Sequence, residues 1–134
     1  MQHIIQVTFV SIFLLILNTS GISQARIEIQ NNSMREMTVK VMKTNSSNGD
    51  LYKIVHISPY GNQTVYFNET GHYFTKTKAS LTGKKPVCRK GESFKVYNGT
   101  DGYSILTLTF TVEESAIHLS SGGSSISESE FDQN

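Results

Sequence analysis

Cysteine, tryptophan and charge are all scarce in this chain of 134 residues, and each shortage excludes a class of protein. With Cys88 as the single cysteine, no disulfide can form within the chain, although small secreted domains usually carry several. Tryptophan, which sugar-binding platforms favour, is absent, and the six tyrosines are expected to pack against cross-strand neighbours. A net charge of +1 is far below that of a dedicated nucleic-acid-binding protein. Stability must therefore come from sheet pairing and apolar packing, and nucleic acid is not an expected partner.

An apolar run near the N-terminus predicts a secretory signal peptide over residues 1–25. The run from Val7 to Leu17 has the length of a signal core and falls short of the roughly 20 apolar residues of a membrane-spanning helix. Ser23 and Ala25 then supply the small residues of a cleavage site before Arg26. An uncleaved anchor and a buried strand are the alternatives. We expect a mature chain without a transmembrane segment, secreted or, in a bacterium, held in the cell envelope.

Apolar and polar residues alternate with a period of two along most of the remaining chain, whereas helical periodicity is nearly absent. The alternation predicts seven strands, at 26–30, 37–41, 51–58, 63–67, 72–79, 93–97 and 104–112. Turns rich in Asn and Gly separate them. Residues 26–119 are therefore predicted to form an all-β domain, an antiparallel β-sandwich of seven or eight short strands. A small β-barrel is the alternative.

One segment adds a weak resemblance to this fold prediction. Between Pro59 and Ala79, the sequence Gly71-His72-Tyr73-Phe74 follows an expected turn. It resembles the proline-glycine and tyrosine-strand element of prealbumin-like and other Ig-like sandwich modules. The resemblance implies a sandwich architecture and implies nothing about function.

Charge is unevenly distributed between the domain and its C-terminal end. Residues 26–114 hold 12 basic and 8 acidic residues, a net of +4, whereas Glu128, Glu130 and Asp132 give the end of the chain −3. Residues 120–134, rich in Ser, Gly and Glu, are predicted to form a disordered tail because they offer little apolar area to bury.

The densest local charge predicts a partner-binding surface. Seven basic residues lie within twenty positions: Lys76, Lys78, Lys84, Lys85, Arg89, Lys90 and Lys95. Such a surface fits an anionic partner, which could be an acidic glycan, lipopolysaccharide-like headgroups, a surface protein or the chain's own acidic tail. The alternative is an ordinary solvated edge that lysines protect from strand pairing.

The sequence contains glycosylation motifs but no catalytic motif. Five Asn-x-Ser/Thr sites fall at or beside expected turns and are candidates for N-glycosylation: Asn31, Asn45, Asn62, Asn68 and Asn98. There is no Gly-x-Ser-x-Gly motif, and the histidines lack the spacing of metal ligands. Adjacent Glu113 and Glu114 should point to opposite faces of a strand. We therefore expect no enzyme activity, cofactor or metal.

The sequence thus predicts a non-enzymatic extracellular binding module. A structural or assembly protein and, less favoured, a small hydrolase are the alternatives. Cys88 follows Pro86 in a short apolar island between basic pairs. We expect its side chain to face the core and Val87 to face solvent, because an exposed free thiol is a liability in an oxidising compartment.

The first prediction concerns processing. Exported protein is expected to begin at Arg26, because Ser23 and Ala25 follow the apolar run at the spacing of a cleavage site. N-terminal sequencing of secreted material checks this. Material that retains Met1 and partitions with membranes would contradict it.

Overall fold

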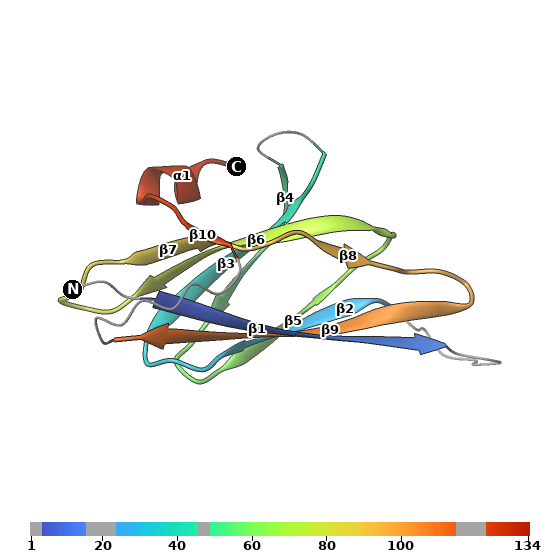
Figure 1. Ribbon diagram of the computed structural model, residues 1–134, viewed down its shortest axis with the longest axis horizontal. Helices are drawn as coiled ribbons and strands as arrows, with labels where there is room; N and C mark the ends of the chain where they lie inside the picture. The colour runs from blue at the N-terminus through green and yellow to red at the C-terminus, as the bar shows by residue number, and fades with distance from the viewer. Residues whose placement is uncertain (1–3, 16–23, 46–48, 115–122) are drawn as a thin grey trace.

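Two β-sheets packed face to face form the protein, and the computed structural model describes residues 4–15, 24–45, 49–114 and 123–134 (Figure 1). Sheet A has the strand order β1 (Ile4–Leu15), β9 (Gly102–Glu113), β2 (Arg26–Asn31), β5 (Asn62–Tyr66). Sheet B has the order β10 (Ser124–Ser125), β7 (Val87–Lys90), β6 (Gly71–Ser80), β3 (Glu36–Lys43), β4 (Asp50–Ile57), and β8 (Phe94–Val96) also pairs with β6. The predicted sandwich is confirmed, and the two sheets do not close into the alternative barrel.

The alternation that predicted the strands is the alternation of burial. In β9, Leu106, Leu108 and Phe110 are buried between the sheets and the threonines between them are partly exposed. All seven expected strands are present with ends within two residues of the prediction. One pairing differs from the expected antiparallel pattern, since β2 runs parallel to β9. A parallel pair needs a long connection between its two strands. The chain between β2 and β9 provides one, because it passes through sheet B before it returns to sheet A.

The N-terminal apolar run forms β1, an edge strand of sheet A. It pairs antiparallel with β9 along its whole length, from Ile4 opposite Glu113 to Leu15 opposite Gly102. Ile5 is buried in the core, and the ring of Phe9 lies 5.3 Å from that of Phe94. Removal of residues 1–25 stays a prediction, and it would take β1 away from β9.

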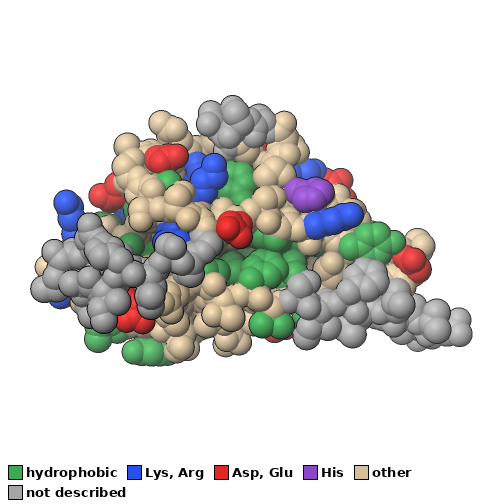
Figure 2. Space-filling model, in the orientation of Figure 1, with side chains coloured by type: hydrophobic (Ala, Val, Ile, Leu, Met, Phe, Trp, Pro, Cys, Tyr) green, Lys and Arg blue, Asp and Glu red, His purple; other side chains and the backbone are tan. Residues whose placement is uncertain are grey.

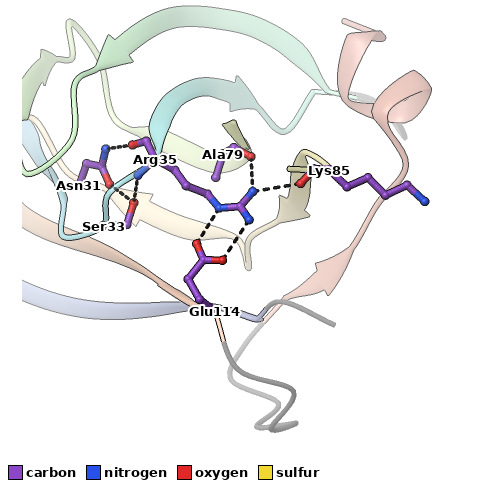
Figure 3. Close-up of polar contacts among 6 residues, drawn as sticks. All are labelled: Asn31, Ser33, Arg35, Ala79, Lys85 and Glu114. Atoms are coloured by element: carbon purple, nitrogen blue, oxygen red, sulfur yellow. Dashed lines mark hydrogen bonds and ion pairs between the residues drawn. The ribbon is translucent and has the colours of Figure 1, made fainter. Parts of the chain in front are cut away.

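A buried arginine ties the two sheets together at one end of the sandwich (Figure 3). Arg35 is fully buried, and its guanidinium donates to both carboxylate oxygens of Glu114, with Nε–Oε1 2.9 Å and Nη2–Oε2 3.1 Å. Its Nη1 also donates to the carbonyl oxygens of Ala79 and Lys85. The two-pronged geometry suits a planar guanidinium better than any other cation. Arg35 thereby holds β3, the end of β9 and the β6–β7 turn in one arrangement.

Asn31 completes this end of the sandwich from sheet A. Its buried side-chain amide donates from Nδ2 to the carbonyl oxygens of Arg35, Ile57 and Ser58. Ser33 Oγ donates to Asn31 Oδ1 and accepts from the Arg35 amide. Nδ2 is the atom to which an N-linked glycan would be attached, so glycosylation at this predicted position is incompatible with the fold. The sequence could not reveal this, because the motif is the same whether Asn is exposed or buried.

The Arg35–Glu114 pair gives the second prediction. Glu114→Gln removes the charge that balances a fully buried guanidinium, and we expect it to lower the free energy of unfolding by about 2–3 kcal/mol. Denaturant unfolding measures the change. The matched control, Glu36→Gln at an exposed site, should stay within about 0.5 kcal/mol of the unsubstituted chain. Equal stabilities for the two variants would contradict the proposed role of the pair.

Candidate functional site

Three lysines lie side by side across the outer face of sheet B. The strand register places Lys40 of β3 directly opposite Lys76 of β6, and Lys76 directly opposite Lys90 of β7. We call these three residues the lysine row. Like charges on directly opposed strand residues repel one another, so such a row is destabilising unless something negative lies over it. Sequence reasoning missed Lys40, because only the register brings β3 beside the basic segment.

The C-terminal end of the chain lies over this row. Residues 123–134, here called the tail segment, add β10 to the edge of β7 and then form a short helix, α1 (Glu128–Asp132), on the outer side of sheet B (Figure 1). The ring of Phe131 is buried against the sheet, 4.6 Å from Lys40 Nζ. Gly123 begins the segment with φ 82°, and a Cβ there would collide with the backbone of Lys90. The tail segment is therefore shaped to fit the sheet closely.

Two members of the lysine row, Lys40 and Lys76, donate to oxygen atoms at the end of the helix. Lys40 Nζ donates to the carbonyl oxygen of Phe131 at 2.8 Å and to Oδ1 of Asn134 at 2.9 Å. Lys76 Nζ donates to the carbonyl oxygens of Glu130 and Gln133 at 3.3 and 3.1 Å. The carbonyl groups at a helix C-terminus carry partial negative charge, so they complement ammonium groups. The contact covers Lys40 and Lys76 to 7% and 5% exposure.

Charge complementarity continues beside the lysine row. Lys78 Nζ lies 2.7 Å from Glu128 Oε1, and this contact raises the pKa of Lys78. Burial, followed by the nearby charge of Lys40, lowers the pKa of Lys76. The ammonium group of Lys76 is therefore partly desolvated, and each hydrogen bond that it donates to an oxygen atom stabilises it.

The structure brings together only some of the seven predicted basic residues. Lys76, Lys78 and Lys90 share the outer face of sheet B with the tail segment, and Lys90 also lies over the Phe74 ring. Arg89 is buried opposite Thr77, on the other face of β7. The rest are exposed elsewhere: Lys84 and Lys85 at the β6–β7 turn and Lys95 on β8. A continuous basic stretch in sequence therefore becomes a smaller site, which Lys40 completes.

The docked tail segment differs from the disordered tail expected from composition. Residues 115–122 lie outside the described part of the chain, whereas residues 123–134 pack on sheet B. Two signals in the sequence were informative. Ser127 and Glu130 have the spacing of a helix-capping pair, and Ser127 Oγ accepts from the Glu130 amide. Phe131 is a large apolar residue in an otherwise polar stretch, which indicates a buried anchor.

The expectation for Cys88 was wrong in direction and right in burial. Val87 packs against the core, so Cys88 points to the opposite face, beside Lys78. It is nevertheless only 6% exposed, and the Ile126 amide donates to the carbonyl oxygen of Cys88. Burial raises the pKa of the Cys88 thiol, while the charge of Lys78 lowers it. The expectation assumed that only the core could bury this thiol, and the sequence could not show that the tail segment covers the outer face.

The remaining candidate groups lie apart from this site. Asn45 and Asn68 are exposed outside the strands, and Asn62 is exposed at the start of β5. Asn98 is partly buried, and its Nδ2 donates to the Phe67 carbonyl. His56 contacts Thr38 Oγ1 through Nδ1, and His72 is exposed. His118 lies outside the described residues.

The third prediction uses Cys88 as a reporter of tail docking. Phe131→Ala removes the buried anchor, and we expect a thiol reagent to label Cys88 at least about tenfold faster, the effect of losing about 1.4 kcal/mol of docking free energy. Labelling kinetics of the native protein measure this. Gln133→Ala is the control, because Gln133 contributes its backbone oxygen to the site. An unchanged rate in Phe131→Ala would show that the tail segment does not cover the thiol in solution.

The described ranges hold neither a membrane-spanning helix nor a cluster of metal ligands. No helix there is long and apolar enough to cross a membrane, and no three His, Cys, Asp or Glu side chains gather as metal ligands. No family model, curated protein or solved structure matches this chain.

Proposed function

We propose that this protein is an exported, non-enzymatic binding module whose outer face of sheet B binds an acidic polypeptide segment with an aromatic anchor. The observation that carries the proposal is the arrangement of the tail segment on the lysine row. An acidic segment binds there through three kinds of contact: backbone oxygens on Lys40 and Lys76, a carboxylate on Lys78, and the Phe131 ring against the sheet.

The chemistry of the site favours a peptide over a glycan. Lys40 and Lys76 receive carbonyl and amide oxygens, which a polypeptide offers at regular spacing. β10 adds a further contact that a peptide can supply and a sugar cannot, because it pairs its backbone with β7. Of the anionic partners considered from sequence, an acidic protein segment therefore has the strongest support.

The tail segment acts in this proposal as a resident ligand that a partner must displace. A tethered ligand competes at an effective concentration of the order of millimolar, so an external segment of equal affinity would bind the intact chain weakly. A partner would succeed with more aromatic or acidic contacts, or by first binding the tail itself.

The fourth prediction tests this site with a defined probe. A synthetic peptide of residues 123–134 is expected to bind a chain that ends at Glu114, and to bind the intact chain at least about tenfold more weakly because the site is occupied. Titration calorimetry measures both affinities. The affinity should fall as salt rises, since the contact includes ion pairs.

Paired substitutions separate the lysine row from general basic charge. In the chain that ends at Glu114, the double variant Lys40→Met with Lys76→Met removes both ammonium groups. It should bind the peptide at least about tenfold more weakly. Lys84→Met with Lys85→Met removes the same charge from the exposed turn and should leave the affinity unchanged. The proposal would be contradicted if the peptide bound neither the intact chain nor the chain that ends at Glu114. It would also be contradicted if the peptide bound the two double lysine variants equally. Heparin that binds better than the peptide would favour the glycan alternative.

A further inference from the structure

We propose that the edge of β9 which β1 covers is a homodimer interface, where the β9 strands of two mature chains pair antiparallel once the N-terminal segment has been removed. The proposal rests on the predicted cleavage before Arg26 and is independent of the function proposed for the lysine row.

Cleavage before Arg26 would leave one long edge of β9 without a partner strand. β1 is joined to β9 along all twelve residues of both strands, so its removal exposes the full set of backbone N–H and C=O groups on that edge of β9. It also removes Ile5 and Val7 from the core and uncovers the side of Leu108 and Phe94. Unpaired strand edges of this length readily pair with another strand.

Strand β9 lacks the features that protect the other edges of the two sheets. Sheet A ends on its other side in β5, which is only five residues long, and sheet B ends in β4, which carries Lys53 and pairs through an irregular register at Val41 and Met42. The other edge of sheet B is β10, which is only two residues long and pairs with the basic strand β7. By contrast, β9 has no lysine, arginine or proline and no charge before Glu113. Native proteins seldom leave such an edge bare.

The pairing of β1 with β9 shows which kind of strand fits this edge. The strand now on this edge is uncharged and places Ile5, Val7 and Phe9 opposite Val112, Phe110 and Leu108. An occupant therefore runs antiparallel to β9, carries no charge and has apolar side chains at alternate positions.

The fit of β1 itself is incomplete. A cavity of about 260 Å³ remains between Val7, Phe9, Leu108 and Phe94, beneath the β7–β8 turn. Apolar side chains reach the surface along the middle of the face seen in Figure 2. β1 thus covers this groove without filling it.

A second copy of β9 meets the requirements for an occupant. It is uncharged from Gly102 to Val112, and from Leu106 to Val112 its apolar residues alternate with threonine. Two such strands meet without like-charge repulsion, and an antiparallel pair joins sheet A of one chain to sheet A of the other in one continuous sheet. Because exported copies have the same bare edge, each is a partner for the next.

The backbone geometry fixes a register for this pair. The Phe110 carbonyl accepts from the Asn32 amide on the β2 side, so the alternate residues, including Thr107 and Thr109, point their backbone groups toward the β1 side. A two-fold axis at Leu108 then places Thr107 of one chain opposite Thr109 of the other in a hydrogen-bonded pair, with both side chains on the outer face.

The experiment uses secreted protein whose N-terminus has been verified as Arg26, studied under reducing conditions so that Cys88 cannot link chains. Sedimentation velocity over a wide concentration range is expected to show a discrete dimer that high salt does not dissociate. Hydrogen exchange should find the Thr107 and Thr109 amides protected in the dimer.

Two double variants test the interface. Thr107→Lys with Thr109→Lys brings four like charges together in the proposed pair, and should raise the dimer dissociation constant by roughly a hundredfold or more. Asn62→Lys with Thr64→Lys adds the same charge to the outer face of β5, at the opposite edge of sheet A, and should leave the dimer intact. Circular dichroism checks that both variants fold. If the first does not fold, exchange at Thr107 and Thr109 in the unsubstituted chain decides.

Several results would overturn the proposal. They are a monomer at every concentration, aggregation without a discrete dimer, a dimer that survives Thr107→Lys with Thr109→Lys, and rapid exchange at Thr107 and Thr109. Native mass spectrometry that finds residues 1–25 still bound, or exported chains that retain them, would show that the leader itself occupies the edge.

Discussion

The structure depends on how the two sheets are held together at the end where Arg35 meets Glu114. A fully buried guanidinium needs a carboxylate and several carbonyl oxygens at fixed positions, and these come from the end of β9, the end of β6 and the β6–β7 turn. The pair sets the position at which the chain leaves sheet A. The other stabilising contact of the structure is on the outer face of sheet B, where the tail segment lies over the lysine row.

The lysine row and the tail segment stabilise one another. Lys40, Lys76 and Lys90 would repel across three adjacent strands if nothing covered them, and a five-residue helix would not persist alone in water. Together they bury Phe131 and Cys88 and provide acceptors for two desolvated ammonium groups. A contact formed from two individually unstable parts can be exchanged for another partner of the same chemistry, which is why we place recognition here.

Two surfaces of this small sandwich are thus completed by the ends of the chain. β1 covers the long edge of β9, and the tail segment covers the outer face of sheet B. Both covers are additions to a body of eight described strands, β2 to β9 inclusive. The proposed dimer interface is an edge of sheet A and the lysine row is on the outer face of sheet B, so pairing through β9 does not use the lysine row itself.

Alternation along the chain by itself determined the fold class and the positions of seven of the ten described strands, because burial in a sheet repeats every two residues whatever the neighbours are. Only the tertiary structure decided which strands are adjacent: the register that aligns Lys40 with Lys76, the inward turn of Arg89, and the burial of Asn31. These depend on contacts between residues far apart in sequence, and no local pattern encodes them. The docked tail segment is the same case, since its Ser127 cap and Phe131 anchor become meaningful only where a sheet face is present to receive them.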